Sequence, residues 1–205
     1  MSAITPKVWT IGFIWLVLLG IGFGLLNVYQ HTPGPSGEAD KGWPVESGIK
    51  TTDDHATLIM FLHPYCPCSS ASLKELNNIT TSCGSAVCAH VVFVLPETSE
   101  KDWKDSDLFA AAIESPDLKV VIDKKGDERR IFDAQTSGQV VVYNASGNLV
   151  FSGGITASRG HEGDNVGRNA IEEILNGSRP GIAETPVYGC ALVAEASLIK
   201  GSTWR

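Results

Sequence analysis

The sequence predicts an α/β domain, with a mixed β-sheet and flanking helices, behind one N-terminal transmembrane helix. Three observations carry this prediction. Residues 8–29 form one uncharged apolar run. After it, short apolar stretches typical of buried strands alternate with amphipathic stretches typical of helices, and such alternation makes parallel crossovers. A strand–turn–strand pattern over residues 139–152 then predicts a hairpin, whose antiparallel strands make the sheet mixed.

The apolar run is long enough to span a bilayer. Residues 8–29 read VWTIGFIWLVLLGIGFGLLNVY, and as a helix they would extend about 33 Å. A cleaved signal peptide is the alternative, but its apolar core usually has about 7–15 residues and ends in a small-x-small cleavage site, which this sequence lacks. We therefore expect residues 1–30 to be a transmembrane signal anchor that contacts the membrane through residues 8–29.

The charges on either side of the run predict its orientation. Lys7 precedes the run, and the next basic residue is Lys41. Basic residues favour the cytoplasmic side of a membrane segment. The N-terminus is therefore expected in the cytoplasm and the rest of the chain outside it, where disulfides persist.

Composition sets the class of the remaining chain. The 205 residues are 43% hydrophobic and 19% charged, which indicates a globular chain of about one domain. The net charge of −7 argues against a nucleic-acid partner, since such a partner needs a basic face. Residues 31–50 are rich in Pro, Gly and charge and predict a flexible linker. The folded domain is expected over residues 51–190, followed by a C-terminal tail over residues 191–205.

The expected elements follow in order along this domain. The predicted strands cover residues 57–62, 91–96, 118–123, 139–143 and 148–152. Predicted helices cover residues 69–79 and 99–115, the second with Ser99 and Asp102 as a capping box. A last helix begins after Asp164 or Asn165 and ends at residues 176–177.

A cysteine loop lies between the first strand and the first helix. The segment FLHPYCPCSSASLKEL places Cys66 and Cys68, separated by Pro67, just before that helix. A thiol at a helix N-terminus meets unpaired N–H groups and the positive end of the helix dipole, which lower its pKa and favour the nucleophilic thiolate. The motif therefore predicts redox chemistry with Cys66 and Cys68 as the catalytic pair; inert thiols and metal ligands are the alternatives.

The order of strand, cysteine loop and helix, with a later hairpin and helix, resembles the thioredoxin fold over residues 50–180. Residues 118–154 are similar to the corresponding part of membrane-anchored thioredoxin-like and peroxiredoxin-like proteins, and the chain most resembles anchored bacterial thioredoxin-like proteins of RedB type. This resemblance implies a single-pass protein of the cell inner membrane with its domain in the periplasm. It also implies a protein thiol or disulfide as partner and no cofactor.

The sequence departs from the thioredoxin pattern in two places. Cys66 falls on the nucleophile and Ser69 on the resolving cysteine of Cys-x-x-Cys, with Cys68 inserted between them. Cys-Pro-Cys is also similar to the redox centre of the mitochondrial intermembrane-space import oxidoreductase, on an unrelated fold. A Cys-x-Cys disulfide closes a small ring and is expected to be strained and oxidising. The thioredoxin cis-proline is absent, and its place reads Thr136-Ser137-Gly138.

Other residues are supporting candidates. His63 precedes Cys66 by three residues and is either a loop residue or a stabiliser of the thiolate. Residues 155–171 form either a solvated loop or one that packs near the cysteines and supplies Arg159 or His161.

The other three cysteines carry separate expectations. Cys83 and Cys88 are spaced to bridge a loop, which predicts a structural disulfide in an oxidising compartment. Cys190 has three interpretations: it resolves a disulfide with the cysteine loop, joins a partner or is simply buried.

Three functional hypotheses remain. The first is an extracytoplasmic thiol–disulfide oxidoreductase in which Cys66 attacks a substrate disulfide and Cys68 resolves the intermediate. The second is a copper chaperone or assembly factor on a thioredoxin fold, with Cys66, Cys68 and His161 as ligands, although such chaperones space their cysteines as Cys-x-x-x-Cys. The third is a non-catalytic redox-sensing module, which the missing cis-proline favours.

Overall fold

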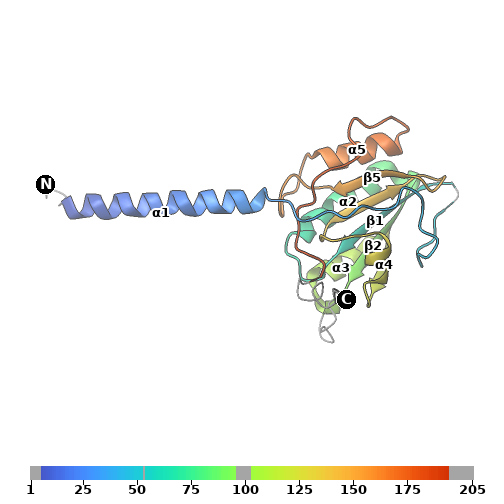
Figure 1. The fold of residues 1–205 in the computed structure, drawn as a ribbon, viewed down its shortest axis with the longest axis horizontal. Coiled ribbons are helices and arrows are strands. Elements are labelled where there is room, and N and C mark those ends of the chain that lie inside the picture. The colour runs from blue at the N-terminus through green and yellow to red at the C-terminus, as the bar shows by residue number, and fades with distance from the viewer. Residues whose placement is uncertain (1–5, 53, 96–102, 194–205) are drawn as a thin grey trace, which may run out of the picture. The chain divides into compact units, whose positions relative to one another are not determined.

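The computed structural model describes residues 6–52, 54–95 and 103–193. The chain forms two compact units, residues 1–32 and residues 33–205 (Figure 1).

The first unit is the helix α1, Pro6–Gln30, of 25 residues. Its large apolar side chains are exposed, among them Trp9, Phe13 and Phe23. Within the described part of the chain it is the one helix long and apolar enough to cross a membrane. A helix that is apolar all round fits a single-pass membrane anchor.

The second unit is built on a five-stranded sheet in the order β3-β2-β1-β4-β5. The strands are β1 (Ala56–Leu62), β2 (Val87–Val94), β3 (Leu118–Asp123), β4 (Gln139–Tyr143) and β5 (Leu149–Gly154). The first three run parallel, β4 pairs antiparallel with β1, and β5 pairs antiparallel with β4. The sheet is therefore mixed, as predicted, and its central strand β1 leads into the cysteine loop.

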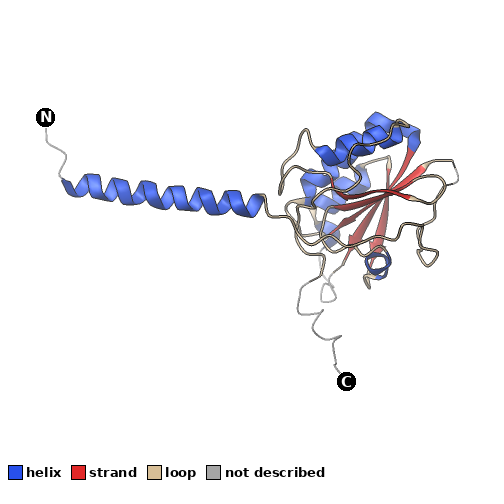
Figure 2. Ribbon diagram, turned by 45° about the horizontal axis from the view of Figure 1, so that its top comes forward, coloured by secondary structure: helices blue, strands red, loops and turns tan. Residues whose placement is uncertain are grey.

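Helices cover the two faces of the sheet unequally (Figure 2). The helices are α2 (Ser69–Cys83), α3 (Asp107–Glu114), α4 (Asp127–Ile131) and α5 (Val166–Leu175), with the 3₁₀ turns η1 (Gly84–Ala86) and η2 (Trp103–Asp105). Because strand side chains alternate, Leu58, Met60 and Leu62 pack under α2, α3 and α5. Their neighbours Ile59 and Phe61 face the side of α4. This mixed sheet with flanking helices is the thioredoxin-like fold that the sequence predicts.

The prediction of a flexible linker over residues 31–50 is wrong for residues 33–50. The Trp43 N–H donates to the Gly147 carbonyl (2.8 Å), and the indole packs edge-on against Phe132 and Tyr143 at 5.5 and 5.1 Å between ring centroids. Ile49 is buried against the same face. The five-residue helix α4 is too short to cover this face alone, so the segment after α1 completes its cover.

The C-terminal side supplies the rest of that cover. Leu192 is buried in the same core as Phe61, and Ala191 bridges to Thr136. The tail expected from residue 191 therefore begins later, while residues 194–205 lie outside the described part of the chain.

Two predicted helix starts have different outcomes. The Asn165 carboxamide accepts the Arg168 N–H (2.8 Å), so the cap expected for α5 is confirmed. The helix expected from residue 99 instead begins at Asp107, where Ser106 caps it by accepting the Phe109 N–H. The Ser99–Asp102 capping box lies outside the described residues.

Replacing Trp43 with Ala should destabilise the domain by about 2–3 kcal/mol, because a half-buried indole leaves an aromatic cluster. Urea denaturation of the protein in detergent measures this. The control is Val45→Ala in the same segment, whose side chain is 89% exposed and should matter little. Equal stability of both variants would mean that the segment is a tether after all.

Candidate redox site at the start of α2

Two consecutive turns place the cysteine loop. The Cys66 N–H donates to the His63 carbonyl and the Ser69 N–H donates to the Cys66 carbonyl, both at 3.1 Å. Cys68 is the residue before the first turn of α2. Cys66 is 4% exposed and Cys68 is half-buried, so the two thiols lie at the helix N-terminus as predicted, one inside and one near the surface.

The surroundings of Cys66 favour its thiolate. Burial alone raises the pKa of the Cys66 thiol, but hydrogen bonds from the Ser69 side chain, the Cys190 thiol and backbone, and the Cys68 backbone outweigh it, so the pKa is lowered. Hydrogen bonds to the charged form favour that form. Cys66 is thus a buried thiol that ionises below the ordinary range.

The two neighbouring thiols behave in the opposite way. Burial, and then the negative charge of Cys66, raise the pKa of Cys68, while Arg159 opposes the rise. Burial, the hydrogen bond with Cys66 and the charges of Cys66 and Cys68 raise the pKa of Cys190 to about 12, again opposed by Arg159. Among these three thiols Cys66 ionises first, and the other two donate toward it.

Arg159 comes from the polar loop that follows β5. Its guanidinium hydrogen-bonds Cys68 and donates to the Gly189 carbonyl. The structure therefore brings Arg159, one of the two residues proposed from this loop, to the thiols. A cation here favours the thiolate form of the neighbouring cysteines.

Ser137 is the middle residue of the Thr136-Ser137-Gly138 segment, where the cis-proline of thioredoxins would be expected. Its hydroxyl accepts the His63 N–H and pairs with the Ser69 hydroxyl, both at 2.7 Å. Its own N–H donates to the Cys190 carbonyl (2.8 Å). One serine thus ties together the cysteine loop, the start of α2 and the C-terminal segment. From the sequence, this position was identified only as lacking the proline, and its hydrogen bonds were not predicted.

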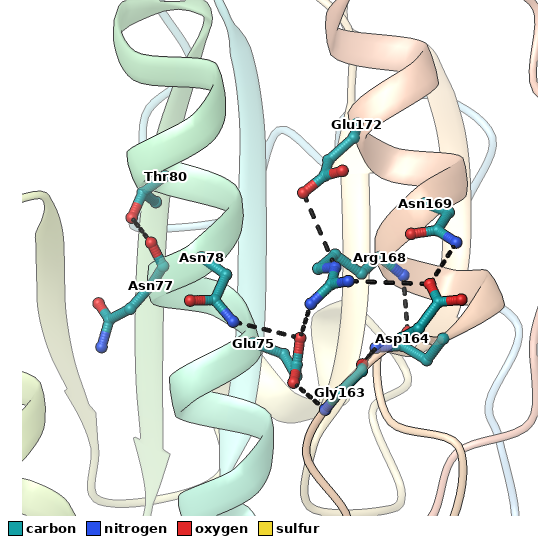
Figure 3. Close-up of polar contacts among 10 residues, drawn as sticks. Glu75, Asn77, Asn78, Thr80, Gly163, Asp164, Arg168, Asn169 and Glu172 are labelled. Carbon is teal, nitrogen blue, oxygen red and sulfur yellow. Dashed lines mark hydrogen bonds and ion pairs between the residues drawn. The ribbon is translucent and has the colours of Figure 1, made fainter.

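A buried ion pair fixes the loop that carries Arg159 (Figure 3). Glu75 of α2 has a side chain only 1% exposed, and it accepts from Arg168 of α5 (2.6 Å) and from the Gly163 N–H (2.7 Å). Asp164 and Glu172 lie 3.8 Å from the same guanidinium. The network joins α2, α5 and the connecting loop. Sequence reasoning noticed the polar loop but not Glu75, because a helical pattern does not show which residue faces a glutamate.

The two candidate histidines contact backbone groups around the cysteine loop. Burial lowers the pKa of His63, and its ring accepts the Tyr65 N–H at 3.3 Å. His161 is exposed, and its ring lies 3.0 Å from the Arg159 carbonyl. Neither of these two contacts involves a thiol. Within the described residues no group of three or more His, Cys, Asp or Glu is placed to hold a metal ion.

The predicted Cys83–Cys88 disulfide is not supported. All five cysteines are free thiols. Cys83 packs on the core under α2, and Val87 and Ala89 of β2 point into that same core. By strand alternation Cys88 points to the opposite face of the sheet. Bridging the two would require the start of β2 to turn over.

Comparison with known proteins yields structural likeness alone. No protein-family model and no curated protein match the sequence. An uncharacterized conserved protein from Geobacillus kaustophilus aligns with a TM-score of 0.56 at 18% identity, over 80% of this chain and 93% of that one. A hypothetical protein from Sinorhizobium meliloti gives the same TM-score and identity over 80% and 96%. The exposed lipoprotein thioredoxin of Streptococcus pneumoniae aligns with a TM-score of 0.43 at 16% identity, over 61% and 86%.

Replacing Ser69 with Ala should raise the pKa of Cys66, because the side chain that donates most to the thiolate is lost. The pH dependence of iodoacetamide alkylation, mapped to Cys66, measures it. Ser70→Ala serves as control, since the Ser70 hydroxyl donates to the Pro67 carbonyl and not to the thiol. If wild type and Ser69→Ala show the same pH dependence of alkylation, the Ser69 hydroxyl does not lower the pKa of Cys66.

Replacing Glu75 with Gln should cost about 3 kcal/mol of stability, because it leaves a guanidinium partly buried without its partner. The exposed Lys74–Glu162 pair provides the control: Glu162→Gln should cost about 0.5 kcal/mol or less. Denaturant midpoints compare the two. If the denaturation midpoint of Glu75→Gln lies as close to that of wild type as the midpoint of Glu162→Gln does, the Glu75–Arg168 pair does not hold the loop in place.

Proposed function

We propose that this protein is a membrane-anchored thiol–disulfide oxidoreductase of RedB type that works through its Cys-Pro-Cys loop. The observation that carries the proposal is Cys66: a buried thiol at a helix N-terminus, with a lowered pKa and two further thiols beside it. A thiolate with a neighbouring thiol is what disulfide exchange requires.

The reaction proceeds in two exchanges. The Cys66 thiolate attacks one sulfur of a substrate disulfide, the substrate S–S bond breaks, and the other substrate sulfur leaves as a thiolate. A second thiol of the site then attacks Cys66 Sγ, releases the remaining substrate sulfur and closes a disulfide in the protein. The substrate is reduced by two electrons and the protein is oxidised by two. A dithiol reductant returns the protein to its starting state, and the same steps in reverse oxidise a dithiol.

The resolving thiol comes from the immediate surroundings of Cys66. The sequence predicts Cys68 for this role, and the fold adds Cys190. Tyr65, half exposed, and Pro67, exposed, are the two sequence neighbours of the buried Cys66. A protein disulfide is the substrate class we propose, since an extended polypeptide can lie across these two side chains to bring its sulfur to Cys66.

The anchor and its charges set the proposed location. Lys7 lies at the start of α1, and no basic residue follows until Lys41. We place the N-terminus in the cytoplasm and the domain on the periplasmic side of the cell inner membrane. The copper-carrier alternative has less support, because the His161 side chain is exposed and its ring contacts the Arg159 carbonyl.

Replacing Cys66 with Ser should reduce disulfide exchange to the uncatalysed background, because a serine hydroxyl does not attack disulfides at neutral pH. Reduction of insulin by dithiothreitol, with the full chain in detergent, measures this. Cys83→Ser is the matched control, since Cys83 ends α2, about 20 Å along the helix from the loop. Undiminished exchange in Cys66→Ser, or an equal loss in Cys83→Ser, would overturn the proposal.

A further inference from the structure

A third thiol reaches the cysteine loop from the far end of the chain. Cys190 hydrogen-bonds the Cys66 sulfur through its side chain and also meets it through its backbone. Cys66 is therefore bordered by Cys68 from its own loop and by Cys190 from the C-terminal segment. A dithiol exchange site needs one neighbour, and this site has two.

The C-terminal segment is built into the fold at this point. The Cys190 carbonyl accepts the Ser137 N–H at 2.8 Å, and the Leu192 N–H donates to the Gln135 carbonyl at 2.9 Å. Leu192 is buried in the core beyond. Arg159 donates to the carbonyl of Gly189, the residue before the cysteine. These contacts on both sides of Cys190 fix the position of its thiol.

Gly189 shows how close this approach is. A Cβ at residue 189 would lie 1.9 Å from the Ser137 carbonyl oxygen, so any other side chain would push the segment away. The absence of a side chain at this position lets the backbone of residues 189–190 lie directly against Ser137. That contact brings the Cys190 sulfur to Cys66.

We propose that Cys190, and not Cys68, is the resolving thiol, so that the oxidised protein carries a Cys66–Cys190 disulfide. The inference rests on the proposed oxidoreductase function and assigns the second step of that reaction. Cys68 remains a thiol throughout this cycle.

Geometry favours Cys190 over Cys68. Cys66 and Cys68 are two residues apart in the turn that leads into α2, and the Cys68 side chain also hydrogen-bonds Cys66. A disulfide between two cysteines at this spacing, however, would close a small, strained ring. Cys190 comes from a separate segment, so the turn that holds Cys66 does not dictate the direction of its side chain.

The charges of the site order the two steps. While Cys66 is a thiolate, its charge and hydrogen bond hold the proton on Cys190. Once the Cys66 sulfur is in the mixed disulfide, that charge is gone, and Arg159 favours ionisation of Cys190. The proton passes to the first substrate thiolate. The Cys190 thiolate then attacks Cys66 Sγ, breaks the mixed disulfide and releases the second substrate sulfur as a thiolate, which takes a proton from water.

The test traps the intermediate in the full chain in detergent. Reduced wild type, Cys68→Ser and Cys190→Ser are each mixed with oxidised glutathione, quenched in acid, alkylated and mapped by peptide mass. We expect a Cys66–Cys190 disulfide in wild type and in Cys68→Ser. Cys190→Ser should instead accumulate glutathione on Cys66, with ring closure slower by on the order of tenfold or more.

Two other outcomes decide against the proposal, and they differ. If Cys68→Ser accumulates the glutathione adduct while Cys190→Ser closes a Cys66–Cys68 bond at the wild-type rate, Cys68 resolves and the oxidoreductase function stands. If Cys66 takes up no glutathione in any of the three proteins, the oxidoreductase function itself fails. Circular dichroism of each variant checks folding, and Cys190→Ala repeats the trap should the serine variant not fold.

Discussion

The Glu75 carboxylate is the interaction on which the arrangement of the site depends. It is buried in α2, neutralised by Arg168 of α5 and hydrogen-bonded by the Gly163 N–H. A buried carboxylate with these partners cannot be shifted cheaply, since any displacement would leave charge without compensation. The loop between β5 and α5 is therefore held against α2, and Arg159 on that loop is kept beside the thiols.

The three thiols of the site differ in pKa. Cys66 is the most buried, yet hydrogen bonds make it the most acidic of the three. Burial, and then the interaction with Cys66, raise the pKa of both neighbouring thiols. In a site of this kind one thiol, Cys66, is the first nucleophile. The order of the two exchange steps then follows from which sulfur carries the negative charge.

Local patterns in the sequence predicted most of the fold. The strand expected over residues 57–62 is β1 with one residue added, and Asn165 caps α5 as expected. The second strand was expected only from residue 91, although β2 begins at Val87; this is why Cys88 was taken for a loop residue able to reach Cys83. The site was only half visible, because Ser137 and Cys190 join it through contacts between distant segments, which no local period reveals.

The unequal cover of the sheet has a practical consequence for the limits of the domain. Trp43 and Leu192 come from segments that composition alone would assign to a linker and a tail, yet both cover the aromatic cluster around Phe132. A version of the protein cut at residue 51 would leave that cluster open to water and prone to self-association. The smallest soluble form therefore begins near Pro33 and includes Leu192, because the segments around Trp43 and Leu192 are parts of the hydrophobic core.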